Sequence, residues 1–255
     1  MTITIAVAGK GGTGKTTVAA LLTRYLATHR RGRSILAIDA DPSSNLHLVL
    51  GLPNPRSVGE IREEMLALSS TGTVGVGIAR RDYLNTEVRM AVEEGDAVDL
   101  LAMGRPEGQG CYCSVNHLLR QIVDDLGHGY DYVVMDNEAG MEHLSRRTTE
   151  DVDWLLVVTD TSQRGIQAAK LMADLTRSLA IRVRNLGLVL NRAPGVLADA
   201  TLAAIAQTGL PLWAQIPEDP LVTEFDRLGR PLAALPAEAP VVRAVERLAA
   251  DVLRI

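Results

Sequence analysis

The segment Gly9–Thr17 reads GKGGTGKTT, and its residue types and spacing point directly to chemistry. It fits the pattern G-x-x-x-x-G-K-[ST], in which backbone N–H groups at a helix start surround phosphate oxygens. Glycines let the backbone close around those oxygens, Lys15 neutralises phosphate charge, and the Thr16 hydroxyl ligates Mg²⁺. The predicted nucleotide-binding residues of this loop are Gly9, Gly11, Gly12, Thr13, Gly14, Lys15, Thr16 and Thr17.

The same glycines allow a second interpretation. Gly9, Gly11 and Gly14 also satisfy G-x-G-x-x-G, and Asp39 ends the next apolar run, as in a dinucleotide-binding unit. A pyrophosphate bridge, however, needs neither a lysine nor a Mg²⁺-binding hydroxyl at the helix start. Lys15 and Thr16 therefore favour the phosphate loop of a nucleoside triphosphatase.

Lysine is rare in this chain, where only Lys10, Lys15 and Lys170 occur among 26 basic residues. The loop pattern G-K-G-G-x-G-K-[ST]-T resembles that of the deviant Walker A ATPases, the family of nitrogenase iron protein, MinD, ParA and ArsA. The resemblance implies a homodimer formed on ATP binding, in which Lys10 reaches the partner's nucleotide and Lys15 its own. A cation supplied across the interface would stabilise charge on the transferring phosphoryl group. The alternative for Lys10 is an exposed loop lysine.

Three carboxylates gain roles from the same resemblance. Asp41, in DADPSSNL, corresponds to the catalytic residue that positions or deprotonates the attacking water, and Asp39 lies near Mg²⁺. Asp136 ends the apolar run VVMD, where the carboxylate reaches Mg²⁺. Gly140 follows in a segment that rearranges when the γ-phosphate leaves. A simple turn is the alternative for Asp41.

Two further segments resemble the parts of this family that hold the adenine base. Asn191 ends LGLVLN and corresponds to an asparagine whose amide donates to and accepts from the base. Pro217 and Glu218, in IPED, correspond to a loop that closes over adenine with its backbone. Asn and Pro also commonly end strands, so a structural role is the alternative for both segments.

The only cysteines of the chain are Cys111 and Cys113, with one tyrosine between them. A disulfide between residues this close would form a small, strained ring. Two thiolates instead supply half of a four-coordinate site for a soft metal such as Zn²⁺ or Ni²⁺, which a dimer would complete. An unliganded pair and a redox dithiol are the alternatives.

The cysteine segment, the glycine loop and MDNEAGMEHLSRRTTEDVD together closely resemble the CooC group of ATPases over nearly the whole chain. That group matures the nickel site of carbon monoxide dehydrogenase and, in relatives, of acetyl-CoA synthase. The resemblance implies Ni²⁺ or Zn²⁺ bound by Cys111 and Cys113 of both subunits, with the ATP state controlling capture and release. The client is then a nickel enzyme such as carbon monoxide dehydrogenase.

Other functions remain possible for an ATPase with this loop. One is a MinD-like or ParA-like positioning or partitioning ATPase with an incidental cysteine pair, and another is a reductase with a bridged iron–sulfur cluster. Three residues also keep two interpretations. His117 is a metal ligand or a helix residue, His143 senses the nucleotide or fills an interface, and Glu138 assists Mg²⁺ or contacts the partner subunit.

Apolar, β-branched runs are the elements that must position these residues. Strands are expected at TITIAVA, SILAIDA, AVDLLAM, YVVMD, WLLVVT, LGLVLN and LWAQIP, with helices between them and less regular helical segments over 51–95. Apolar strands that alternate with helices predict a mostly parallel sheet covered on both faces. The expected architecture is an α/β P-loop NTPase of the deviant Walker A type, with residues 1–255 in a single domain.

The composition limits the location and the partners. No apolar run reaches the ~18 residues of a membrane span, and the first residues lack a basic signal region, so we expect a cytoplasmic protein. The net charge of −5 gives no general attraction to nucleic acid or anionic lipid. The C-terminal PVVRAVERLAADVLRI has mixed charge and lacks aromatic anchors, which favours a helix packed on the sheet. We therefore expect no nucleic-acid or membrane partner.

Overall fold

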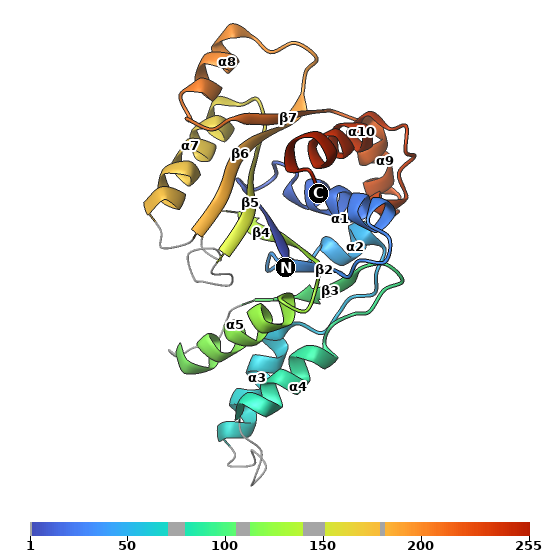
Figure 1. The fold of residues 1–255 in the computed structure, drawn as a ribbon, viewed down its shortest axis with the longest axis vertical. Coiled ribbons are helices and arrows are strands. Elements are labelled where there is room, and N and C mark those ends of the chain that lie inside the picture. Colours follow the sequence, from blue (N-terminus) through green and yellow to red (C-terminus); the bar gives the residue numbers. More distant parts are fainter. Residues whose placement is uncertain (1, 71–79, 106–112, 140–150, 179–181) are drawn as a thin grey trace.

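The computed structural model describes residues 2–70, 80–105, 113–139, 151–178 and 182–255 (Figure 1). The seven strands of these residues form one sheet in the spatial order β3-β2-β4-β1-β5-β6-β7. Every neighbouring pair is parallel, which confirms the predicted α/β class. The strands are β1 (Ile3–Gly9), β2 (Ile35–Ala40), β3 (Asp99–Ala102), β4 (Tyr132–Ala139), β5 (Asp151–Thr159), β6 (Arg182–Ala193) and β7 (Leu212–Pro217).

The central strands are buried on both faces of the sheet. Consecutive side chains of a strand point to opposite sides, so each of these strands contributes to two cores. In β1, Ile5 and Val7 pack into one apolar core, whereas Ala6 and Ala8 pack into the other. Continuous apolar runs are therefore the sequence signature of this sheet. β6 begins four residues before its predicted run LGLVLN. The prediction missed these residues because they are exposed or half-buried and mostly polar, so they lack the apolar signature.

Helices cover both faces of the sheet (Figure 1). The face of Ile5 and Val7 is covered by α1 (Lys15–His29), α2 (Leu46–Leu50), α9 (Pro220–Arg227), the 3₁₀ helix η1 (Leu232–Ala234), α10 (Pro240–Arg247) and the π-helix η2 (Leu248–Leu253). The other face is covered by α3 (Val58–Ser70), α4 (Arg80–Met90), α5 (Cys113–Gly127), α7 (Gln163–Ser178) and α8 (Asp199–Ala206). Helices were expected within 51–95 and at the C-terminal segment, and both expectations are confirmed. In the described part of the chain, no helix combines the length and apolar character needed to cross a membrane.

Parallel pairing brings the carboxyl ends of the strands to one edge of the sheet. The register aligns Asp136 of β4 with Val7 of β1 on one side and with Asp39 of β2 on the other. β1 ends at Gly9, and α1 begins shortly afterwards at Lys15. Open parallel sheets bind their ligands at this edge, so the predicted phosphate loop and the predicted carboxylates lie where a ligand is expected.

Candidate nucleotide site

The loop between β1 and α1 adopts a backbone conformation that its glycines allow. Gly12 and Gly14 have φ angles of 78° and 88°, in the left-handed region. An added Cβ at Gly14 would also lie 2.2 Å from Asn191 Nδ2. The buried Thr13 closes the turn by donating its hydroxyl hydrogen to the Lys10 carbonyl at 2.8 Å. Gly14 is therefore required both by its backbone angle and by the space around it.

The first turn of α1 favours an anion. α1 starts at Lys15, and its N-terminal N–H groups and helix dipole carry partial positive charge. No acidic residue lies in this turn, so a phosphate meets no like charge there. Lys15 is only 6% exposed, which holds its positive charge next to the loop.

Thr16 and Asp136 meet beneath the loop. Thr16 Oγ1 donates a hydrogen bond to Asp136 Oδ2 at 2.6 Å. Oδ1 of the same carboxylate is buried and has no hydrogen-bond partner among the described residues. Burial raises the pKa of Asp136 to about 7 against the hydrogen bond from Thr16, and the negative charge of Asp39 adds to the rise. A hydroxyl beside a buried carboxylate with an unpaired oxygen fits a Mg²⁺ site. The positive charge of the ion would offset the free-energy cost of burying the ionised carboxylate.

Asp39 and Asp41 lie at the same edge, at the end of β2. Asp39 is buried, and its two oxygens accept the N–H groups of Asp41 at 3.1 Å and Leu46 at 2.9 Å. Burial raises the pKa of Asp39 against these two hydrogen bonds. Asp41 is half-buried and accepts from the Ser43 N–H at 2.9 Å. The turn considered as the alternative for Asp41 is thus present, and it holds this carboxylate at the edge of the site.

A cavity of about 410 Å³ opens in front of the loop. Lys10 does not line it, and this residue is exposed. Asp39 and Asp136 are each only 1% exposed and lie below the surface. The predicted residues that line the cavity are Gly11, Gly12, Gly14, Lys15, Thr16, Thr17, Asp41, Asn191, Pro217 and Glu218. The tertiary structure therefore brings together the predicted phosphate loop, the predicted base-binding segments and Asp41.

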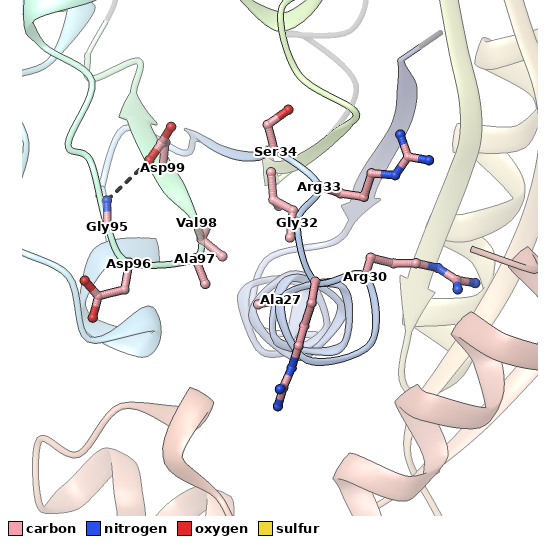
Figure 2. Close-up of a pocket in the computed structure, with 12 residues that line it drawn as sticks. Ala27, Arg30, Gly32, Arg33, Ser34, Gly95, Asp96, Ala97, Val98 and Asp99 are labelled. Carbon is pink, nitrogen blue, oxygen red and sulfur yellow. Dashed lines mark hydrogen bonds between the residues drawn. The ribbon is translucent and has the colours of Figure 1, made fainter.

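A second cavity, of about 470 Å³, lies at the opposite edge of the sheet, between the turn that follows α1 and the start of β3 (Figure 2). Its charged groups do not converge, since Figure 2 shows Arg30 and Arg33 extending away from Asp99. Arg33 pairs with Asp131 at 3.0 Å, and Asp99 accepts the Gly95 N–H at 3.3 Å. The cavity at the carboxyl edge is therefore the candidate site.

Asn191 uses part of its amide on the protein itself. This residue is buried, and its Nδ2 donates to the Thr13 carbonyl at 2.8 Å. Its Oδ1 and second amide hydrogen have no hydrogen-bond partner among the described residues. The next residue, Arg192, lines the cavity and donates from its guanidinium to the Gly12 carbonyl. No pattern in the sequence predicted Arg192, because its partner lies 180 positions away.

Asp219 is a second residue of the site that the sequence analysis did not predict. It is buried, lines the cavity and caps α9 by accepting the Leu221 N–H at 3.0 Å. Its other oxygen accepts the Val241 N–H at 3.3 Å, which connects α9 to α10. An aspartate directly before Pro220 is a recognisable helix-start signal, so local sequence could have found this residue.

The predicted metal-binding cysteines are only partly covered by the structure. Cys113 is the first residue of α5, whereas Cys111, Gly140 and His143 lie outside the described residues. His117 lies within α5, and Glu138 is half-buried in β4. The described residues contain no group of three or more His, Cys, Asp and Glu side chains that could hold a metal ion.

A parallel sheet with a glycine loop, a helix N-terminus and a hydroxyl–carboxylate pair at its carboxyl edge defines a P-loop nucleotide-binding protein. The model of the CbiA family, described as the CobQ/CobB/MinD/ParA nucleotide binding domain, matches residues 4–232. The chain belongs to this family and is an ATPase of the MinD/ParA type, which confirms the predicted enzyme class.

Three similar proteins place the chain within the family. An uncharacterized ATP-binding protein of Methanocaldococcus jannaschii is 41% identical over 249 residues, which cover 98% of each chain. The carbon monoxide dehydrogenase accessory protein CooC of Rhodospirillum rubrum is 35% identical over 190 residues, 70% of each chain rather than nearly the whole. The septum site-determining protein MinD of Pyrococcus horikoshii, solved with Mg-ADP, superposes with a TM-score of 0.67 at 25% identity, covering 99% of this chain and 96% of that one.

Proposed function

We propose that this chain is a dimeric, Mg²⁺-ATP-dependent metallochaperone of the cytoplasm that assists nickel insertion into carbon monoxide dehydrogenase or a related enzyme. Its cargo, Ni²⁺ or Zn²⁺, would be bound by Cys111 and Cys113 of each subunit. One observation carries the proposal: a chain with the loop lysines Lys10 and Lys15 and a close cysteine pair is 35% identical to CooC over 190 residues. The whole chain, residues 1–255, would act as one domain.

The described geometry supports the nucleotide part of this proposal. The loop and the first turn of α1 would surround the phosphates, with Lys15 and the helix dipole opposing their charge. Thr16 and Asp136 would hold Mg²⁺, which neutralises phosphate charge when bound. Asp41, at the edge of the cavity, would orient the attacking water. Asn191 would accept from the adenine amino group through Oδ1, since one of its amide hydrogens is bound to the loop.

The dimer part of the proposal is supported by the position of Lys10. Its side chain is exposed and does not line the cavity of its own chain. A cation in this position is free to reach a nucleotide bound by a second copy. The same pairing would bring two cysteine pairs together as four thiolates, a donor set that suits Zn²⁺ in tetrahedral and Ni²⁺ in square-planar geometry. Nucleotide hydrolysis would then change metal or client binding by changing the dimer.

The test is metal binding by the double variant Cys111→Ser, Cys113→Ser under anaerobic conditions. We expect the parent protein to bind about one Ni²⁺ or Zn²⁺ per dimer and the variant to bind none, as four thiolates make one site. Both should bind Mg-ATP equally. The neighbouring Ser114→Ala variant serves as the control and should retain the metal. Unchanged metal affinity in the double variant would reject the cysteine site and leave the ATPase assignment intact.

A MinD-like positioning or partitioning ATPase is the second candidate function. The superposition on MinD over 99% of the chain favours it, because the likeness is not restricted to the nucleotide site. This candidate predicts ATP-dependent sedimentation with liposomes or DNA that is the same with and without Ni²⁺. The metallochaperone instead predicts that ATP-trapped protein retains a nickel enzyme from its own cells and sediments with neither surface.

A further inference from the structure

Asn191 and Arg192 are consecutive residues of β6, yet both side chains bind the same loop. In a regular strand such neighbours point to opposite faces of the sheet. The pairing of β6 with β7 is irregular at this point, because its register shifts between Leu190 and Ala193. Leu190 pairs with Gln215 and Ala193 pairs with Pro217, so two residues of β6 lie opposite one residue of β7 between these pairs. One extra residue on one strand is the pattern of a β-bulge. Bulges re-aim side chains, and this one turns two neighbours towards the phosphate loop.

The backbone conformation of Arg192, within this bulge, is also unusual. Its φ angle is 51°, in the left-handed region that residues with a Cβ rarely adopt. Such conformations persist where surrounding contacts over-determine them, and they cluster at functional sites. Arg192 is exposed, so packing in the core does not impose this angle. The contact that accompanies it is the hydrogen bond from the guanidinium to the Gly12 carbonyl.

This hydrogen bond acts on a part of the loop that has little other support. A Cβ added at Gly12 would meet nothing within 4 Å, so no neighbouring atoms pack against that side of its Cα. The next carbonyl, of Thr13, is held by Asn191 at 2.8 Å. Because the carbonyl and N–H of one peptide group point in opposite directions, fixing the Thr13 carbonyl turns the Gly14 N–H away from Asn191. Two consecutive peptide groups of the loop are therefore oriented from β6.

We propose that Arg192 is a positioning residue of the nucleotide site. By holding the Gly12 carbonyl, it sets the apex of the phosphate loop before the nucleotide arrives, and the bulge and the positive φ angle serve this contact. Arg192 acts on the loop and not on the reacting atoms. The inference rests on the proposed role of the loop in binding ATP, and it is independent of the cysteine pair.

The decisive variant is Arg192→Gly, because glycine adopts the positive φ angle without strain while the guanidinium is lost. We expect the affinity for Mg-ATP and Mg-ADP to fall at least about tenfold, the usual scale for one charge-assisted hydrogen bond. KM for ATP should rise while kcat changes less than about twofold, because the contact is made in the ground state as well as in the transition state. The melting temperature without nucleotide should stay equal or rise. Arg192→Lys, which keeps a cationic donor, should restore part of the affinity.

Arg184→Ala is the matched control, since Arg184 is an exposed arginine of the same strand that pairs with Asp153 at 2.9 Å, away from the site. Arg192→Asn, with a residue that tolerates a positive φ angle, replaces the glycine variant if that variant fails to fold. Unchanged nucleotide affinity with a lower melting temperature in the Arg192 variants would overturn the inference and leave the ATPase assignment standing. A parent chain that bound no nucleotide would overturn both together.

Discussion

The Thr16 hydroxyl donates a 2.6 Å hydrogen bond to Asp136 Oδ2, although 120 positions separate the two residues in the chain. Thr16 lies in the first turn of α1, and Asp136 lies in β4, the strand inserted between β1 and β2. The bond joins the phosphate loop to the carboxylate edge of the sheet. It therefore marks the position at which a nucleotide and its Mg²⁺ would meet.

Replacing Thr16 should separate the magnesium-dependent part of nucleotide binding from the rest. In Thr16→Ala the hydroxyl is lost and Mg²⁺ keeps only the carboxylate, so we expect Mg-ATP hydrolysis to fall by about 10²-fold or more, the usual scale for losing one catalytic electrostatic contact. ADP binding measured in EDTA should change little. Thr16→Ser keeps the hydroxyl and should retain most of the activity. Equal loss in the alanine and serine variants would argue against a metal-binding hydroxyl.

The burial of Asp136 should make a contribution to the stability of the protein without metal and nucleotide that falls as the pH rises. The pKa of Asp136 is raised from 3.8 to about 7, so the unfolded chain loses this proton before the folded chain does. Stability is thus lost from the ordinary pKa of an aspartate upwards, and the loss levels off above about pH 7. Asp136→Asn removes this contribution. The change in melting temperature from pH 5 to pH 8 should therefore be less negative, or more positive, in the variant than in the parent protein, and an equal change would contradict the assigned cause.

The two loop lysines should have different roles. Lys15 is buried beside the loop, whereas Lys10 is exposed. Lys10→Ala should bind ATP with nearly the parent affinity but lose hydrolysis, since the cation that it offers to a second copy is absent. Dimer formation with ATP, measured by light scattering, should weaken as well. The third lysine of the chain, Lys170, is the control, and full hydrolysis by Lys10→Ala would remove the proposed role across the dimer.

Gly14 and Gly32 allow strain and steric clash to be separated. Their φ angles are 88° and 80°, but an added Cβ would meet Asn191 Nδ2 at 2.2 Å only at Gly14, whereas at Gly32 nothing lies within 4 Å. Both alanine variants should lose about 1–3 kcal/mol of stability from backbone strain. Gly14→Ala alone should also lose nucleotide binding, as the added methyl group displaces Asn191. Calorimetric binding of ADP to both variants tests this, and normal binding by Gly14→Ala would contradict it.

Asp219 should stabilise the wall of the cavity. Asp219→Ala removes the cap of α9 and leaves the buried Val241 N–H without its acceptor, so we expect a loss of about 1–3 kcal/mol in the free energy of unfolding. Urea denaturation should show a lower midpoint with an unchanged slope. The exposed Asp226, in the same helix, provides the control. If Asp219→Ala lowers the free energy of unfolding no more than Asp226→Ala does, the prediction is wrong. Water would then replace the hydrogen bonds of the carboxylate without loss of stability.

Much of the architecture follows from local features of the sequence. The central strands could be predicted because they are apolar runs buried on both faces, as in β1 and β2, and this burial leaves a continuous signature. The phosphate loop could be predicted because nine consecutive residues, Gly9–Thr17, contain its glycines, its lysines and its hydroxyl groups. In both cases the local residue pattern is enough to predict the local backbone conformation.

The contacts that complete the site depend on tertiary structure. Strand order brings Asp136 to Thr16, and a bulge in β6 brings Asn191 and Arg192 to loop carbonyls 178 and 180 positions away. Side-chain periodicity indicates which face of a strand is buried, but it does not encode which strands are neighbours or in what register they pair. The sequence alone determined that this chain carries a phosphate loop on a parallel sheet. Only the folded sheet decided which side chains hold that loop in place, because those contacts arise between strands that are distant in the chain.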